Sequence, residues 1–275
     1  MTAGLLALTS SLVWGFADFF GGLKSRTLGV LAVMLVSQLV GTTLIGTAVI
    51  LRAEAPHDAR VLLAVPASIA GTLGLVAFYR GMKIGAISIV APIAGLAAVV
   101  PVIYGIATGD RPSPAQLAGM ALALAGVVLA SREPGRTSRV ATGAGLALLS
   151  AVGFGCYFPL MHAASSADSL WATMTFRIVS TSIVCAAAVL VRPSLRLSRG
   201  NLVAVAAIGV FDMLGNLLFA LASPRGLVSV VSVLASLYPV VTVALAAVVL
   251  RERIAPSQRL GVGAALAGVV LLSAG

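Results

Sequence analysis

The segment LVSVVSVLASLYPVVTVALAAVVL, residues 227–250, decides the fold class, because none of its side chains is charged. A bilayer core about 30 Å thick is crossed by a helix of roughly 20 apolar residues. The segment does not alternate polar and apolar residues as a membrane-spanning β-strand would. Open sheet edges are also excluded from lipid, since their backbone groups would lack hydrogen-bond partners. We therefore expect a transmembrane helix.

Nine further segments of the same kind lie before and after this one, and short connections between them hold nearly all the charge. The ten predicted spans are residues 3–22, 28–51, 61–79, 86–107, 115–131, 142–163, 169–191, 201–222, 227–250 and 258–274. Overall, 60% of residues are hydrophobic, the mean hydropathy is +1.10 and only 9% are charged, whereas soluble proteins have about 25% charged residues. The sequence thus predicts an all-α integral membrane protein with ten transmembrane helices.

The sequence also contains an internal repeat. GMALALAGVVLAS (119–131) and GVGAALAGVVLLS (261–273) agree at nine of thirteen positions. GAISIV from Gly85 matches GLVSVV from Gly226 at a nearly equal offset. Ordered matches of this kind indicate a duplication rather than the chance similarity of apolar helices.

Each copy of the repeat contains five spans. Because five is odd, two consecutive copies must enter the membrane in opposite directions, which makes an inverted repeat. Secondary transporters are typically built this way, with the substrate site near the midplane between the copies. We divide the chain into two five-helix bundles, residues 1–137 and 138–275, with the charged segment REPGRTSRVA (132–141) between the apolar parts.

Two long stretches carry a resemblance to a known family. Residues 78–131 and 226–273, each with the closing motif AGVVL, resemble the EamA domain of the drug/metabolite transporter superfamily. The resemblance implies a ten-helix exporter of small metabolites, amino acids or drugs, and leaves the substrate open. The family usually has a Glu after the fourth span of each copy; here the second copy has Glu252 and the first has Asp110. We expect a structural role for this acid at a helix end.

The family also tends to place an Arg in the second span of each copy. Arg177 matches this pattern, whereas the first copy has Gln38 instead. The resemblance thus draws attention to these two positions together.

The distribution of positive charge predicts the orientation. Odd-numbered connections carry thirteen Lys and Arg residues, and even-numbered ones carry four: Arg52, Arg60, Arg111 and Arg225. The positive-inside rule places the richer set in the cytoplasm and both termini outside. We expect a multi-pass protein of the cytoplasmic (inner) membrane, whose partner is the lipid bilayer. The net charge of +10 forms no basic stripe, so no nucleic-acid partner is expected.

Ionisable side chains in the middle of a span are costly and mark candidate functional sites. Arg177 and Asp212 stand out, and Asn216 lies one turn after Asp212 on the same helix face. Gly215 beside them is expected to leave room for a ligand or water. Two interpretations stay open: a buried ion pair that fixes helix packing, or a cavity in which Arg177 holds an anionic group and Asp212 an amine or a proton.

Asp18 is a weaker candidate, because it stands only six residues before Lys24. It shares a helix face with Trp14, which suits a cavity wall, but an interfacial structural role is the leading expectation. An acid in the first span is also similar to small multidrug transporters of the same superfamily. Further candidates for the cavity wall, each of which could equally make an interhelical hydrogen bond, are Gln38, Tyr104, Tyr157, His162 and Tyr238. Tyr79 and Trp171 are expected in the aromatic belts.

The functional prediction is a secondary transporter that exports small metabolites, such as amino acids, or drugs by alternating access at a central cavity. Protons are a possible coupling ion, and a monomer is expected to suffice. A channel or facilitator for small solutes is the alternative. No catalytic residue, metal site or cofactor is predicted, because the sequence lacks HExxH, paired Asp and P-loop motifs. An enzyme is therefore not expected.

Overall fold

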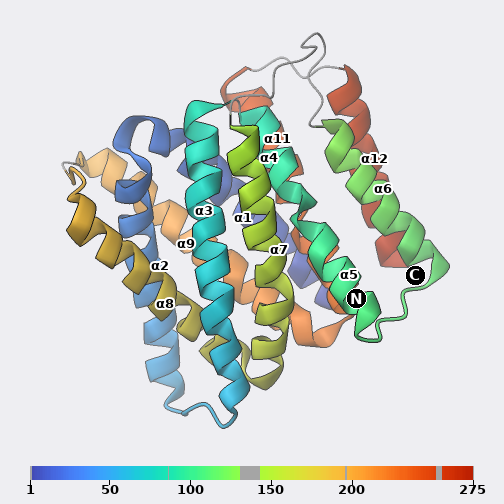
Figure 1. Cartoon of the computed structure of the whole chain (residues 1–275), viewed down its shortest axis with the longest axis horizontal. Coiled ribbons are helices and arrows are strands. Elements are labelled where there is room, and N and C mark those ends of the chain that lie inside the picture. The colour runs from blue at the N-terminus through green and yellow to red at the C-terminus, as the bar shows by residue number, and fades with distance from the viewer. Residues whose placement is uncertain (1, 86, 131–142, 196, 252–255, 275) are drawn as a thin grey trace.

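The computed structural model describes residues 2–85, 87–130, 143–195, 197–251 and 256–274 (Figure 1). Every regular element within these residues is a helix, which confirms the all-α part of the predicted fold class. The α-helices are α1 (Thr2–Leu28), α2 (Val30–Arg52), α3 (Ala64–Ile84), α4 (Ile87–Ala94), α5 (Val99–Ala107), α6 (Pro114–Ala130), α7 (Ala144–Ala167), α8 (Ser169–Val191), α9 (Arg199–Ala222), α10 (Val228–Ala235), α11 (Tyr238–Val249) and α12 (Pro256–Ala274). Short 3-10 helices are η1 (Ala59–Leu63), η2 (Gly95–Ala98) and η3 (Ser223–Arg225).

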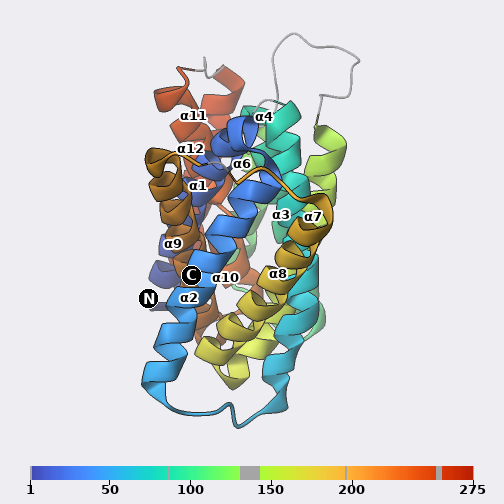
Figure 2. The same ribbon diagram turned by 90° about the vertical axis from the view of Figure 1, so that its left-hand side faces the viewer.

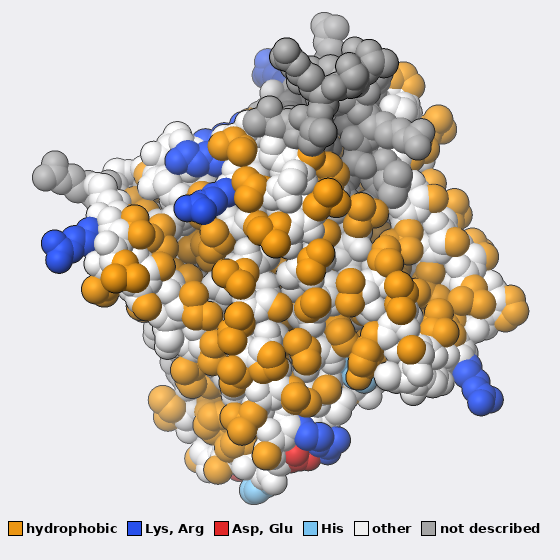
Figure 3. All heavy atoms as spheres, in the orientation of Figure 1, with side chains coloured by type: hydrophobic (Ala, Val, Ile, Leu, Met, Phe, Trp, Pro, Cys, Tyr) orange, Lys and Arg blue, Asp and Glu red, His pale blue; other side chains and the backbone are white. Residues whose placement is uncertain are grey.

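Seven helical stretches among the described residues are long and apolar enough to cross a membrane. They are Thr2–Leu28, Val30–Arg52, Ala59–Ile84, Ala144–Ala167, Ser169–Val191, Arg199–Arg225 and Val228–Val249. Gly95–Ala107 and Pro114–Gly126 are shorter apolar helices. Figure 3 shows hydrophobic side chains across the middle of the visible face, with Lys and Arg side chains toward its edges. The protein is therefore a multi-pass membrane protein, and the count of ten spans stays a prediction.

The predicted fourth and ninth spans are both interrupted near their middles. Residues 86–107 contain α4, the tighter turn η2 and then α5, whereas α10 and α11 are separated at Ser236 and Leu237. Pro239 lies in the first turn of α11, where its missing N–H costs no helical hydrogen bond. An apolar run predicts the length of a span, but it does not show where the helix within it breaks.

The helices of the two halves make equivalent contacts. The packing of α1 against α9 has its counterpart in α3 against α7, and that of α4 against α11 in α5 against α10. The pairs α2 with α8 and α6 with α12 each join equivalent helices, and α2 and α8 lie side by side in Figure 2. In Figure 1, α6 rises toward the top while α12 descends to the C-terminus. The equivalent helices α6 and α12 thus run in opposite directions.

The contact between α6 and α12 is very close. A Cβ atom added at Gly268 would lie 2.6 Å from the carbonyl oxygen of Gly119 and from the backbone nitrogen of Ala123. Small residues allow membrane helices to approach in this way and to gain van der Waals contact. The predicted packing between the fifth and tenth spans is therefore confirmed.

Polar side chains cap several helices where the chain leaves the apolar segments. Ser113 and Gln116 form a capping box at the start of α6: Ser113 N donates to Gln116 Oε1 at 2.9 Å, and Gln116 N to Ser113 Oγ at 3.2 Å. Asp168 accepts hydrogen bonds from Leu170 N and Trp171 N at the start of α8. These caps satisfy N–H groups that have no partner inside the helix.

Two aromatic expectations have different outcomes. Tyr79 was expected in a belt, but it is 2% exposed and its hydroxyl donates to the carbonyl oxygen of Ala17 at 3.4 Å. That expectation was wrong, because α3 packs on α1 and Gly21 leaves space for the ring. Trp171 is partly buried near a helix end, and its indole N–H donates to the carbonyl oxygen of Glu54 at 2.8 Å. Its position is compatible with a belt residue.

Candidate functional site

A cavity of about 60 Å³ lies between the two halves of the chain. Helices α1, α2 and α3 of the first half and α7, α8, α9 and α11 of the second form its wall. The lining residues are Trp14, Asp18, Gln38, Gly71, Thr72, Leu75, Phe154, Tyr157, Phe158, Phe176, Asp212, Asn216 and Tyr238. This volume holds a few water molecules, so a larger ligand requires the helices to move apart.

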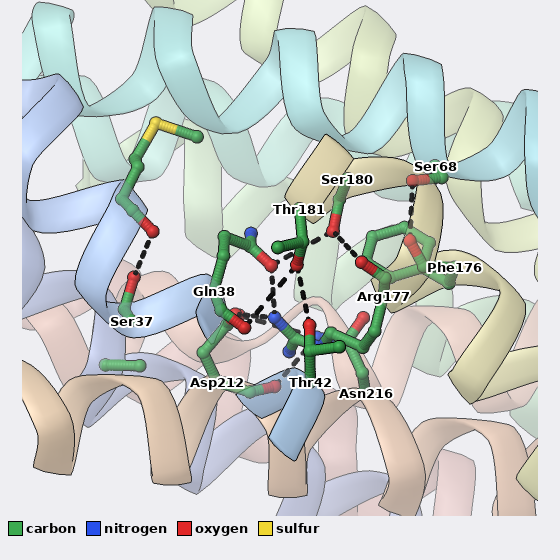
Figure 4. Close-up of polar contacts among 12 residues, drawn as sticks. Ser37, Gln38, Thr42, Ser68, Phe176, Arg177, Ser180, Thr181, Asp212 and Asn216 are labelled. Atoms are coloured by element: carbon green, nitrogen blue, oxygen red, sulfur yellow. Dashed lines mark hydrogen bonds and ion pairs between the residues drawn. The ribbon is translucent and has the colours of Figure 1, made fainter. Parts of the chain in front are cut away.

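An ion pair between α8 and α9 borders the cavity (Figure 4). Arg177 is fully buried, and its Nη1 lies 2.8 Å from Oδ2 of Asp212. The same Nη1 donates to Gln38 Oε1 at 2.8 Å, and Ser180 Oγ donates to that oxygen at 3.0 Å. Gln38 thus joins the first half of the chain to an ion pair in the second. An Arg at position 38 would instead place two positive groups side by side.

The ion pair continues into a chain of hydrogen bonds along α9. Asn216 Nδ2 donates to the carbonyl oxygen of Asp212 at 2.7 Å and lies 3.4 Å from its Oδ1. The hydroxyl of Tyr157 donates to Asn216 Oδ1 at 2.9 Å. A buried network of this kind is rigid when each member has a partner. Asp212 and Asn216 are therefore held in place on the cavity wall, and Arg177 lies behind them.

Three polar side chains on the cavity wall have no hydrogen-bond partner among the described residues. They come from three different helices: Asp18 from α1, Thr72 from α3 and Tyr238 from α11. The hydroxyl oxygens of Thr72 and Tyr238 are buried without a partner, and Asp18 is 7% exposed with no described hydrogen bond or ion pair. Buried polar groups in native proteins nearly always have partners. These three groups therefore have unused hydrogen-bonding capacity toward the cavity.

Aromatic rings cover much of the remaining wall. The ring of Trp14 lies 6.1 Å from that of Tyr157 and 6.2 Å from that of Phe158, both in edge-to-face geometry. Tyr157 contacts Phe176 at 5.3 Å, and Phe154 contacts Tyr238 at 6.3 Å between ring centroids. Such pairs hold the rings in defined orientations. The cavity therefore combines a rigid aromatic wall with a few polar groups, as ligand sites commonly do.

Seven of the eight predicted site residues line this one cavity: Trp14, Asp18, Gln38, Tyr157, Asp212, Asn216 and Tyr238. The eighth, Arg177, contacts two of them. The interfacial expectation for Asp18 was wrong, because α1 extends to Leu28 and Asp18 faces the helices of the second half.

Gly215, Tyr104 and His162 are not among the residues that line the cavity. Gly215 does not leave room for a ligand, because the indole of Trp14 occupies that space, with Cδ1 2.5 Å from a Cβ built there. Tyr104 is 39% exposed and lies away from the cavity. His162 is partly buried, with its Nδ1 2.7 Å from Ser223 Oγ.

Sequence reasoning missed Thr72, Phe158 and Phe176 as lining residues. Hydroxyl and phenyl groups are common in apolar spans, so nothing in their type distinguishes these three. One signal was present: Phe158 follows Phe154 by one helical turn, and Phe154 aligns with Trp14 in the repeat, as Ser150 does with Ser10 and Gly155 with Gly15. Residues one turn apart share a helix face, which would have placed Phe158 on the wall.

The acid after the fourth span has the structural role that was expected of it. Oδ2 of Asp110 accepts hydrogen bonds from Ser229 N at 2.9 Å and from Ser229 Oγ at 2.7 Å. Asp110 of the first half thus caps α10 of the second half. Its counterpart Glu252 lies outside the described residues. No group of three or more His, Cys, Asp or Glu side chains suited to a metal ion occurs in the part of the chain that the structure describes.

A helical membrane protein with a cavity between two similar halves has the architecture of a transporter. A model of the EamA-like transporter family matches residues 1–132 and again residues 141–274. The chain therefore belongs to the EamA-like transporter family, within the drug/metabolite transporter superfamily.

Comparison with solved structures supports the fold. Among solved structures, 29 chains match. One of them, described as "Crystal structure of protein", has a TM-score of 0.79 and 18% sequence identity, and the match covers 98% of this chain and 95% of that one. At this identity the likeness shows the fold alone. No curated protein matches this sequence.

Proposed function

We propose that the protein is a secondary transporter that exports small metabolites, such as amino acids, or drugs by alternating access. The observation that carries this proposal is a cavity lined by residues of both halves, from Trp14 and Gln38 in the first to Asp212 and Tyr238 in the second. If the halves rock against each other, such a cavity opens to either side of the membrane in turn. Its small volume fits a conformation in which both sides are nearly closed.

The proposed topology is an inverted repeat of ten transmembrane helices in two five-helix bundles. It counts α4 with α5, and α10 with α11, as one broken span each. The opposite directions of α6 and α12 (Figure 1) and the equivalent contacts of the two halves support it. Broken helices beside a central site are typical of transporters built from inverted repeats. We place the protein in the cytoplasmic membrane, with both termini outside, and expect it to function as a monomer.

Protons are the proposed coupling ion, with Asp212 as their site. Asp212 pairs with Arg177 at 2.8 Å, so the pair must separate during the cycle for the carboxylate to exchange a proton. Replacing Asp212 with Asn should abolish transport driven by a pH gradient. Asp58→Asn is a suitable control, because Asp58 precedes η1 and does not line the cavity. Unchanged coupling in the Asp212→Asn variant would remove this role.

A channel or facilitator is the alternative mechanism. Purified protein in proteoliposomes should take up small metabolites and drugs with saturation, and faster when a pH gradient is imposed. Currents that rise without saturation, or ions that pass while every small organic solute is refused, would contradict the transporter and favour the channel. Solute uptake that saturates but ignores any ion gradient would favour the facilitator.

A further inference from the structure

The cavity wall has a distinct charge balance. Two carboxylates, Asp18 and Asp212, line the cavity, and none of the lining residues is Lys, Arg or His. Arg177 offsets only one of these carboxylates, because its Nη1 lies 2.8 Å from Asp212 and no described cation contacts Asp18. When Asp18 is ionised, one negative charge without a cationic partner among the described residues faces the cavity from α1. An anion entering the cavity would meet this charge without a compensating group on the wall.

The three unpartnered side chains on the wall, Asp18, Thr72 and Tyr238, can all accept hydrogen bonds. Asp18 offers two carboxylate oxygens, and the hydroxyl oxygens of Thr72 and Tyr238 are acceptors too. No hydrogen bond joins them to one another within the described residues. A protonated primary amine carries three N–H donors and a protonated secondary amine two, so either fits a wall with several free acceptors on different helices. A quaternary ammonium group has no N–H donor and would leave these oxygens unsatisfied.

The aromatic wall favours the same class of ligand. Trp14, Tyr157 and Phe158 contact one another beside the acidic group of α1. Aromatic faces attract cations through the ring quadrupole, most strongly for Trp. They also remove an apolar body from water, at about 25 cal/mol for each Å² buried. A cationic head beside Asp18 and a hydrophobic body among the rings would use both features.

A carboxylate on the ligand would find no cationic partner on the wall; the hydroxyls of Thr72 and Tyr238 can donate to it, but Asp18 beside them carries charge of the same sign when it is ionised. Nε and Nη2 of Arg177 have no hydrogen-bond partner among the described residues, but Arg177 does not line the cavity and is fully buried behind it. An amino-acid zwitterion would therefore bind less well than the amine that lacks its carboxylate. We therefore expect the cavity to discriminate between the amine and the amino acid by their charge more than by their size.

From these observations we propose that the substrate class of this cavity is a protonated hydrophobic amine, bound through Asp18, Thr72 and Tyr238 against the aromatic wall of Trp14, Tyr157 and Phe158. This inference rests on the proposed transport function and specifies its substrate. Because the cavity measures about 60 Å³, an amine with more than a few heavy atoms binds only when the cavity widens.

The proposal can be tested by fluorescence, since the chain has two Trp residues and only one lines the cavity. Trp171→Phe leaves Trp14 as the single reporter. In detergent at neutral pH, 2-phenylethylamine should change the Trp14 emission with saturation. Phenylalanine should bind at least tenfold more weakly, and 3-phenylpropionate should not bind. Equal or tighter binding of 3-phenylpropionate, or no saturable response to any amine from n-butylamine to 2-phenylethylamine, would overturn the proposal.

Three variants in the Trp171→Phe background test whether Asp18, Thr72 and Tyr238 each contribute to amine binding. Asp18→Asn should weaken amine binding at least tenfold, while Asp58→Asn leaves it unchanged. Thr72→Val and Tyr238→Phe should each weaken it a few-fold without lowering the melting temperature, because neither hydroxyl makes a hydrogen bond to any residue that the structure describes. A purely structural role predicts the opposite, namely lower stability with unchanged binding. If the carboxyl and the two hydroxyls only hold water, all three variants bind the amine as the parent does, which would also overturn the proposal.

Transport assays separate this inference from the proposed function. Amine binding without amine flux in proteoliposomes would contradict the transporter and leave the binding site in place. Flux of other solutes without amine binding would contradict the site and leave the transporter in place. Amine flux that falls in Asp18→Asn and persists in Asp58→Asn would support both.

Discussion

The two halves of the molecule share a scaffold but differ in the chemistry that they bring to the cavity. Asp212 of α9 corresponds through the repeat to Gly71 of α3, and both positions line the wall. Asp18 of α1 corresponds to Phe158 of α7, and again both line it. Each half therefore supplies one acid where the other supplies an uncharged residue. The duplication preserved where helices meet, while the side chains at those places diverged.

The second span of each half shows the same divergence. Gln38 and Arg177 occupy equivalent positions in α2 and α8, which pack against each other, and their side chains form one hydrogen bond at 2.8 Å. Because the two side chains are in direct contact, an Arg at both positions would bring two positive charges together. A neutral acceptor on one side allows the other to keep its positive charge and to pair with Asp212.

Replacing Arg177 with Gln gives both halves the same residue at this position, and it should have the largest effect on stability. Arg177→Gln leaves the carboxylate of Asp212, whose side chain is only 15% exposed, without its ion partner. Breaking a buried pair on one side costs about 3–5 kcal/mol. We expect a correspondingly lower free energy of unfolding, measured by thermal unfolding in detergent. The double variant Arg177→Gln with Asp212→Asn should recover most of the loss. A single variant as stable as the parent would contradict the importance of this pair.

The contact of α3 with α8 and the contact of α9 with α2 are equivalent in the repeat, but different residues form them. In the first contact Ser68 Oγ donates to the carbonyl oxygen of Phe176 at 2.8 Å. At the equivalent place in the second contact, a Cβ built at Gly209 would lie 2.4 Å from the carbonyl oxygen of Ser37. Gly209→Ala should therefore cost about 1–3 kcal/mol through overpacking against backbone. Gly200→Ala in the same helix is the matched control, because nothing lies within 4 Å of a Cβ there. Equal melting temperatures for the two variants would show that the close contact is unimportant.

The cap that joins the halves should have a smaller effect. Asp110→Ala removes the acceptor of Ser229 N in the first turn of α10, where no helical carbonyl is available. Loss of such a cap costs about 0.5–2 kcal/mol. Ser229→Ala removes only the hydroxyl and should cost less than Asp110→Ala. Hydrogen exchange at the start of α10 would locate the change, and protection there that stays as in the parent would count against the cap.

The smallest effect on stability is expected for the ion pair between Arg52, at the C-terminal end of α2, and Asp168, at the N-terminal end of α8. Nη1 of Arg52 lies 2.7 Å from Oδ2 of Asp168, but the Arg52 side chain is 34% exposed. Exposed pairs contribute little and are screened by salt. Arg52→Gln should lower the melting temperature slightly at low salt and not at 1 M salt. Asp168→Ala should be worse at both, since it also removes the cap of α8. A salt-independent loss in Arg52→Gln would point to packing instead of charge.

Much of the candidate site could be predicted from the sequence, because charged residues are costly in lipid and therefore rare. Arg177 and Asp212 stand out in spans that otherwise hold apolar residues, and the structure brings them to 2.8 Å. Asp18 was harder, since its short distance from Lys24 indicated the interface. Only the length of α1 and its packing against α9 place Asp18 on the cavity wall.

Other features of the site could not be read from residue types. Thr72 and Phe176 resemble many residues elsewhere in the spans, and the breaks at η2 and at Ser236 interrupt apolar runs without a charged residue. In a soluble helix, polar residues mark the face that contacts water. In a membrane helix, both the lipid-facing side and the packed side are apolar, so this signal is weak.

The sequence by itself determined that lipid is the solvent, that the secondary structure is helical and that the chain is a duplication. These properties follow from composition, segment length and repeated motifs, which need no knowledge of contacts. Only the tertiary structure decided which helix faces meet, and with them the composition of the cavity. Asp18, Thr72 and Tyr238 come from three separate helices, and only the packing of those helices leaves all three without a partner among the described residues. The physical reason is that hydrogen-bond satisfaction depends on neighbours in space, which no single segment contains.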